Sequence, residues 1–129
     1  MRVFKTKPFS RFSSYEGIDD ALLCEAVKRA ESGLVDADLG GGVIKQRLPR
    51  EGQGRSGGFR SIVLFRQGNR AIFAYGFAKN QRENIGHPEL KAFRKLSEVM
   101  LSEVMLSLDD RALKAAISNG AMMEVICDG

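Results

Sequence analysis

Residues 59–77, FRSIVLFRQGNRAIFAYGF, constrain the fold of this chain more than any other stretch. Two runs rich in β-branched and aromatic residues flank the turn sequence QGN, a pattern typical of a β-hairpin. Side chains alternate between the two faces of a strand, which separates basic and aliphatic residues from aromatic and small ones. One face then has Arg60, Ile62, Leu64 and Arg66, and the other has Phe59, Ser61, Val63 and Phe65. The sequence therefore predicts an antiparallel sheet that is basic on part of one face.

The segment before this hairpin, GQGRSGG at residues 52–58, has the G-x-G-x-x-G spacing of nucleotide-binding loops. That spacing indicates a dinucleotide site only when a helix follows, because the helix N-terminus binds the pyrophosphate. Here a strand follows. Kinase and P-loop sites are excluded too, since there is no H-R-D loop, no D-F-G, and no Lys-Ser or Lys-Thr after the glycines. Two interpretations stay open: the glycines let the backbone and Arg55 approach a phosphate chain, or they only form a turn.

The basic residues are concentrated in one part of the chain. Between Lys45 and Arg82 there are nine basic side chains and one acidic one, so this segment carries +8 and the rest carries −4 of the net charge of +4. Such a concentration on strands and their connecting loop is typical of a site for a polyanion. The alternative is a solvated hairpin whose arginines share a sign by chance.

The rest of the chain has the patterns of further strands and helices. Residues 18–30 repeat apolar residues at helical spacing, with acidic residues in the first turn and a glycine after the end. The segment SGLVDADLGGG is expected to be a turn region, and the tail after residue 120 a small strand or an ordered extension. The other expected elements are a strand at 1–6, a short helix at 8–15, a strand at 43–49, a long helix at 88–108 and a capped helix at 107–120.

Length and composition are those of one compact domain, with 43% hydrophobic and 28% charged residues among 129. No apolar run approaches the roughly 18 residues of a membrane span, and the first residues lack a signal-peptide block. We therefore expect a cytoplasmic protein without membrane contact. Cys24 and Cys127 form no C-x-x-C pair, and we interpret both as reduced thiols outside any disulfide or metal site.

Residues 41–84, GGVIKQRLPREGQGRSGGFRSIVLFRQGNRAIFAYGFAKNQREN, resemble the central signature of RelE/HigB-like toxins of type II toxin–antitoxin systems, in the RelE/ParE superfamily. The resemblance implies an α+β fold in which an N-terminal strand and two helices precede an antiparallel sheet with a basic face, followed by C-terminal helices. We predict a toxin domain at 1–107 and a C-terminal helical extension at 108–129, packed on or beside the same domain. The resemblance also implies cleavage of mRNA, usually on the ribosome, without metal or cofactor, and an antitoxin, often HigA-like with a helix-turn-helix domain.

Such cleavage would use the 2′-hydroxyl of RNA as the nucleophile. The protein must then remove that proton, stabilise charge on the phosphoryl oxygens and protonate the leaving 5′-oxygen. A histidine pair is excluded, because His87 is the only histidine and its place before Pro88 indicates helix capping. Lysine, arginine and tyrosine remain, and cations crowded on one face lower the pKa of a neighbouring lysine.

The resemblance carries over to individual residues. Lys45 and Arg47 match the family's basic strand, Arg60 its Gly-Gly-x-Arg arginine, and Lys79 its Lys-Asn lysine. We expect the two lysines to transfer protons and the two arginines to stabilise charge. Tyr75 is the fifth predicted catalytic residue; whether it donates a proton, stacks on a base or is buried stays open. The residues predicted to bind RNA are Arg50, Arg55, Arg66, Arg70, Asn80 and Arg82.

Two other functions fit parts of this pattern. A ParE-like inhibitor of DNA gyrase belongs to the same superfamily, but it does not need the Lys/Arg set at positions 45, 47, 60 and 79. A non-catalytic RNA-binding module could use the same basic sheet, and it would bind in a salt-sensitive way without cutting. The preferred hypothesis is a ribosome-dependent mRNA endoribonuclease.

Overall fold

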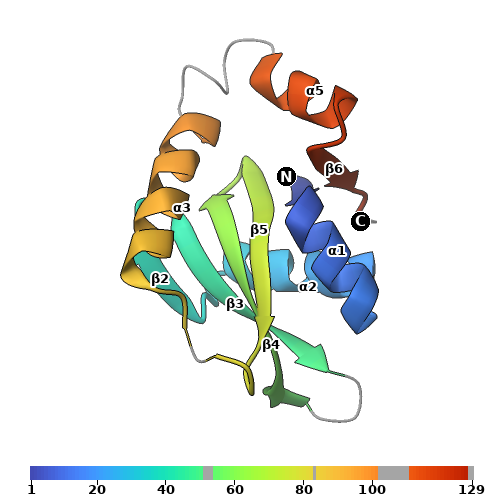
Figure 1. Ribbon diagram of the computed structural model, residues 1–129, viewed down its shortest axis with the longest axis vertical. Coiled ribbons are helices and arrows are strands. Elements are labelled where there is room, and N and C mark those ends of the chain that lie inside the picture. Colours follow the sequence, from blue (N-terminus) through green and yellow to red (C-terminus); the bar gives the residue numbers. More distant parts are fainter. Residues whose placement is uncertain (51–53, 83, 102–110, 128–129) are drawn as a thin grey trace.

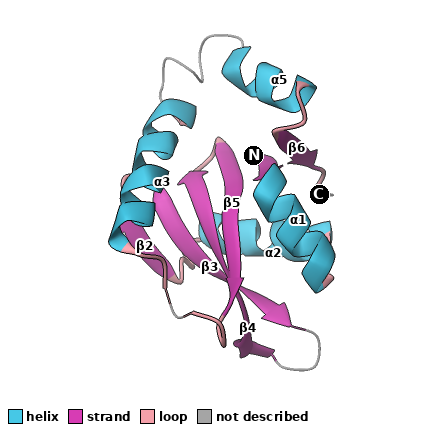
Figure 2. Cartoon of the chain, viewed as in Figure 1, coloured by secondary structure: helices cyan, strands magenta, loops and turns pink. Residues whose placement is uncertain are grey.

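The computed structural model describes residues 1–129 except 51–53, 83, 102–110 and 128–129, and it also leaves undescribed the side chains of 50, 54–57, 111–113 and 116. A sheet is flanked by helices on both faces (Figures 1 and 2). In chain order the elements are β1 (Arg2–Thr6), α1 (Lys7–Glu16), α2 (Asp20–Glu31), β2 (Ala37–Gly40), β3 (Val43–Arg50), β4 (Gly54–Arg66), β5 (Arg70–Ala78), α3 (His87–Met100), α5 (Arg111–Ser118) and β6 (Met122–Val125).

The sheet has the strand order β2-β3-β4-β5-β1-β6. All neighbouring strands pair antiparallel except β1 and β5, which are parallel and place Arg2 opposite Arg70. The predicted hairpin is β4–β5, with Arg66 paired to Arg70 across its turn. The α+β fold expected from the sequence, with a mostly antiparallel sheet between N-terminal and C-terminal helices, is confirmed.

Two strand boundaries differ from those expected. Residues Ala37–Gly40, expected in a turn, form β2 and pair with β3 through Ala37 opposite Lys45. The glycine-rich segment is not all loop either, because Gly54 already pairs with Arg50 and β4 runs on from there. Strand pairing outweighs the turn preference of glycine in both places, and no helix follows the glycines.

Each face of the sheet has its own apolar core. The first core packs α1 and α2 against the odd-numbered side chains of β4, and includes Phe9, Leu23, Phe59 and Val63. The second lies on the opposite face and includes Ile62, Leu64 and Phe77 of the sheet together with Leu90 and Phe93 of α3. The alternation predicted for residues 59–66 is thus confirmed. Burial of both faces fixes the register, since a slip by one residue would exchange every side chain between them.

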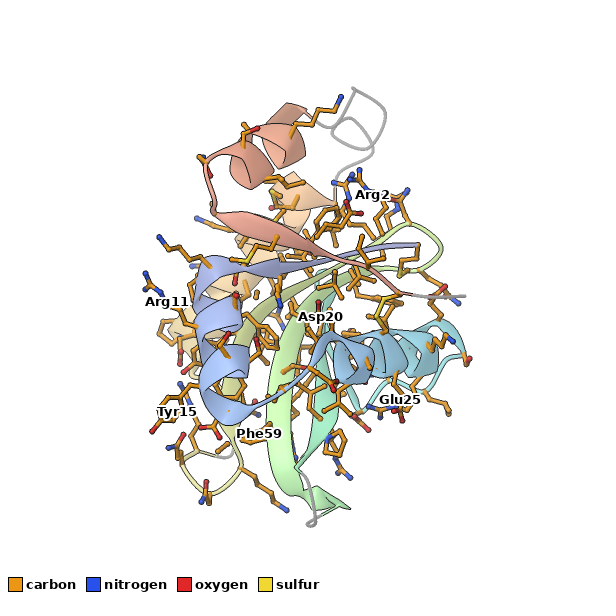
Figure 3. The ribbon with its side chains drawn as sticks, turned by 90° about the vertical axis from the view of Figure 1, so that its right-hand side faces the viewer. Arg2, Arg11, Tyr15, Asp20, Glu25 and Phe59 are labelled. Carbon is orange, nitrogen blue, oxygen red and sulfur yellow. A yellow bond between two sulfur atoms is a disulfide. The ribbon has the colours of Figure 1, made fainter. Side chains whose placement is uncertain are left out.

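Helix α1 begins at a side-chain cap and packs close to β5. The Thr6 hydroxyl accepts a hydrogen bond from the Phe9 N–H at 3.3 Å, as an N-cap residue does. A Cβ at Gly76 would lie 2.4 Å from the Phe12 ring, so only glycine at this position allows the helix to approach the strand. In Figure 3, Arg11 and Tyr15 point away from the sheet on the outer side of this helix.

The C-terminal strand β6 forms one edge of the sheet, next to β1, and the segment after it contains one of the two cysteines. Strand β6 pairs with β1, and the Arg2 guanidinium binds Glu124 at 3.1 Å. Cys24 of α2 and Cys127, just beyond β6, are joined in a disulfide rather than being reduced thiols. The sequence gives no sign of this pair because a separation of 103 residues carries no information on Cα distance, which is 5.6 Å here.

Helix α3 is only partly covered. Its Leu90, Phe93 and Met100 pack on the second core, whereas Leu96 and Val99 are 41% and 56% exposed. The helix expected at 88–108 is described as far as Met100, and residues 102–110, where the next helix was predicted to begin, lie outside the described residues. The predicted glycine stop at Gly120 follows α5 with φ of 79°. Every helix in the described part of the chain is too short or too polar to cross a bilayer.

Candidate functional site

The candidate site lies on the face of the sheet that carries the second core. Strand register places Lys45 opposite Ile62, and Arg47 opposite Arg60. Ile62 belongs to the second core, so period-two alternation puts Lys45, Arg47 and Arg60 on the same face. The Lys79 N–H donates to Gly58 O at 3.4 Å, which continues this register just past β5. Three neighbouring strands thus bring together cations that are far apart in the sequence.

These four cations line one pocket of about 270 Å³, together with Asp36 and Ala37. Lys45, Arg47, Arg60 and Lys79 are four of the five residues that the sequence singled out for catalysis, and the fifth, Tyr75, is not among the residues that line the pocket. Arg47 and Lys79 are exposed, Lys45 is half-buried and Arg60 is 6% exposed. The pocket therefore has a buried guanidinium on its sheet side and solvent-accessible cations beside it, an arrangement suited to a phosphate.

Burial and charge both act on Arg60. Burial lowers the pKa of its guanidinium from the ordinary value, the positive charge of Arg47 lowers that pKa further, and the Asp36 carboxylate opposes both effects. An arginine starts from so high a pKa that it remains protonated at neutral pH. Arg60 Nη1 also donates to the carbonyl oxygen of the preceding residue, Phe59, at 3.3 Å, and this hydrogen bond helps to hold the Arg60 side chain against the sheet. The pocket thus contains a fixed positive charge near its buried side.

A second cluster lies beside the pocket on the same face. Ile62 of β4 pairs with Lys45 of β3 on one side and with Tyr75 of β5 on the other, so the three residues form one row across the sheet. Arg82 Nη1 donates to the Tyr75 hydroxyl at 3.2 Å, and the Arg82 guanidinium lies 5.6 Å from the Phe77 ring centre. Glu89 accepts two hydrogen bonds from Arg82, at 2.6 and 3.2 Å. This pairing raises the pKa of Arg82 and lowers the pKa of Glu89.

Two larger hollows lie elsewhere on the described surface. One, of about 370 Å³, lies between Gly42 and Leu101 and is lined mainly by apolar groups, with Arg66 as its one cation. The other, of about 420 Å³, lies beside Cys24 with Lys28 as its one cation. A single cation in each gives little attraction for a polyanion, so size alone does not identify the site.

The sequence matches a family model described as the RelE toxin of the RelE/RelB toxin–antitoxin system, over residues 1–125. The chain belongs to the RelE toxin family. Membership makes it a toxin of a toxin–antitoxin system and implies an antitoxin partner. No curated protein matches the sequence significantly. The family match and the basic pocket therefore agree with the resemblance carried by residues 41–84.

Two arginines that the sequence assigned to RNA binding lie away from the pocket of this RelE-family chain. Arg66 Nη1 donates to Leu101 O and Arg70 Nη1 donates to Met100 O, both at 3.0 Å. Cations at a helix C-terminus are stabilised by its exposed carbonyls and dipole. Arg70 is only 3% exposed. Both side chains thus anchor the end of α3, and we do not include them among the residues proposed to bind RNA.

The remaining predicted residues are placed only in part. Asn80 is exposed directly after Lys79, whereas the side chains of Arg50 and Arg55 lie outside the described residues. His87 is the exposed first residue of α3 and does not cap it. The cap comes from Glu89, whose carboxylate accepts from the Gly86 N–H at 2.8 Å. The expectation that His87 caps the helix is therefore wrong.

Sequence reasoning did not find Asp36, an acidic residue among four cations in the pocket. It stands in DADLGGG, a segment expected to be a turn, and two acids before a glycine run give no signal for a functional site. In the fold it directly precedes β2, at the edge of the sheet next to Arg47. Its position depends on pairing between segments separated in sequence, so only the fold reveals it.

Proposed function

We propose that this RelE-family toxin is an endoribonuclease that cuts mRNA on the ribosome and so inhibits translation. One observation carries the proposal: Lys45, Arg47, Arg60 and Lys79 converge on one pocket of about 270 Å³. Four cations around a small pocket match the charge of a scissile phosphate, which gains negative charge in the transition state.

The chemistry divides between lysines and arginines. In the proposed reaction a 2′-hydroxyl loses its proton and attacks the adjacent phosphorus, the bond to the 5′-oxygen breaks, and that oxygen takes up a proton. Arg60 and Arg47 suit the phosphoryl oxygens, because a guanidinium stays charged and donates two parallel hydrogen bonds. Lys45 on β3 and Lys79 just past β5 lie beside the same pocket, so one can take the first proton and the other supply the last.

The Tyr75–Arg82 cluster is proposed to hold the neighbouring nucleotide. The Tyr75 hydroxyl already accepts from Arg82, which leaves its own proton free to be donated outward. Glu89 takes up much of the charge of Arg82, so we assign Arg82 to orienting Tyr75 as well as to contacting RNA. Asn80, Arg50 and Arg55 remain predicted contacts with the RNA backbone.

The antitoxin is proposed to be HigA-like, with a helix-turn-helix domain, and the toxin to act in the cytoplasm. The basic pocket and the exposed Leu96 and Val99 of α3 offer it a charged and an apolar contact. An acidic segment that covered the pocket would block RNA directly.

The test uses purified toxin, a defined message and translating ribosomes, with free message in parallel. Cuts are mapped by primer extension, and the message is then remade with a 2′-deoxynucleotide on the 5′ side of each cut. We expect cuts in the ribosomal A site, and we expect the 2′-deoxy message to stay whole because it lacks the nucleophile. Cuts on free RNA would remove the ribosome from the mechanism. An uncut message together with inhibited DNA supercoiling would replace the proposal with gyrase inhibition, and salt-sensitive RNA binding without cutting would leave a binding protein.

A further inference from the structure

Arg47 pairs with Arg60 of β4 on one side of β3, but on the other side its backbone is held by side chains instead of by a strand. Its N–H donates to Asp36 Oδ2 at 2.6 Å, and its carbonyl accepts from Arg29 Nη2 at 2.7 Å. The β2–β3 register pairs Ala37 with Lys45, so a longer β2 would place residue 35 opposite Arg47. Because β2 begins at Ala37, the carboxylate and guanidinium take the positions that a strand backbone would have filled.

This pair of side chains is itself anchored. Arg29 comes from α2 and lies 3.7 Å from Asp36 Oδ2, with the two side chains only 16% and 23% exposed. The Asp36 N–H donates to Gln46 Oε1 at 2.7 Å, and buried Gln46 donates in turn to Ala26 O in α2 at 3.0 Å. The contacts therefore tie β3 at Arg47 to the helix that covers the other face of the sheet.

We infer that Asp36 and Arg29 are positioning residues for the proposed cleavage reaction, which fix the β3 backbone so that the Arg47 guanidinium points to the scissile phosphate. The inference rests on the proposed function. The Asp36 carboxylate also lines the pocket, where its charge offsets part of the repulsion among four cations before RNA binds. Substitutions at Asp36 can distinguish the effect of its hydrogen bond to the Arg47 N–H from the effect of its charge.

The variants are chosen to make that separation. Asp36→Ala removes the acceptor and the charge, whereas Asp36→Asn keeps an oxygen that can accept from the Arg47 N–H. Asp38→Ala is the matched control, because Asp38 is an exposed acid on β2 outside the pocket lining. Each variant is made in the full chain and compared for single-turnover cleavage, Michaelis constant, melting temperature and amide hydrogen exchange at Arg47.

We expect Asp36→Ala to slow single-turnover cleavage by about tenfold or more, because small displacements of a charge-stabilising group are costly in rate. Asp36→Asn should stay within about threefold of the wild-type rate, because it keeps an acceptor for the Arg47 N–H, and it should bind RNA more tightly, because it removes a negative charge that repels the phosphates. In an Arg47→Ala background, Asp36→Ala should cause no further loss. The Arg47 amide should exchange faster in Asp36→Ala than in the Asp38→Ala control.

The same loss from Asp36→Ala with and without Arg47 would overturn the inference, and so would equal losses from Asp36→Ala and Asp38→Ala. If the wild type cuts no RNA, the proposed function fails on its own. Arg47 amide exchange then decides the positioning role alone: unchanged protection in Asp36→Ala would overturn it, and selective loss of protection would retain it.

Discussion

Reduction of the Cys24–Cys127 disulfide is expected to lower the free energy of unfolding by several kcal/mol. The bond joins α2 to the segment after β6, and it closes a loop across a sequence separation of 103 residues. Closing a loop of that length restricts the unfolded chain, and the chain-entropy relation gives about 4.7 kcal/mol at 25 °C. For a domain of this size that corresponds to roughly 15 °C in melting temperature.

The assay is denaturant unfolding of the same purified protein in oxidised and fully reduced form. A Cys24→Ser variant is the control, since reductant should not change its unfolding midpoint. We expect the oxidised wild type to hold no titratable thiol before unfolding and to unfold at a higher denaturant concentration than the reduced form. Two reactive thiols in the oxidised protein, or a difference below about 1 kcal/mol, would refute the reasoning.

Three further outcomes follow from the structure. Gly42→Ala should destabilise the protein by at least about 1 kcal/mol more than Gly68→Ala in denaturant unfolding. Both glycines have positive φ, but only a Cβ at Gly42 would lie 2.5 Å from Ser97 Oγ. Equal losses of stability in the two variants would contradict this contact. The carboxyl of Glu89 has its pKa lowered by Arg82, so its contribution to stability is present above the ordinary value of 4.5 and is lost as the pH falls through the folded-state pKa. Glu89→Gln should therefore reduce the fall in stability between about pH 6.5 and about pH 3, and an unchanged difference would contradict this. Binding of single-stranded RNA should weaken with salt at a logarithmic slope near about −2, as expected if the pocket, Arg50 and Arg55 each neutralise one phosphate, and a slope near zero would exclude the pocket as the RNA site.

Local patterns in the sequence were sufficient to predict most of the fold. Alternation in residues 59–66 correctly assigned side chains to the two faces, because both faces are buried and the register cannot slip. Helical periodicity likewise gave α2, and the glycine after residue 119 gave the end of α5. Strand β2 was missed because its DADLGGG segment has the composition of a turn, and only pairing with β3 makes it a strand.

The sequence predicted the site residues that match the family signature, but not those that depend on contacts between remote segments. The four pocket cations were predicted from the family resemblance, and strand register brings them together. Positive charge alone could not separate Arg66 and Arg70 from these, because their partners are carbonyls at the end of a helix far along the chain. Asp36 and the disulfide were missed for the same reason, since both depend on distances between remote segments.

The most direct test of the central claim is the single-turnover rate of message cleavage by Lys79→Ala beside Lys91→Ala. Both lysines are exposed, but only Lys79 lines the pocket, while Lys91 lies on α3. If the pocket performs proton transfer, Lys79→Ala should lower the rate by about a hundredfold at an unchanged melting temperature, and Lys91→Ala should leave the rate within about twofold of wild type. Equal rates for the two variants would contradict the assignment of the pocket as the place where RNA is cut.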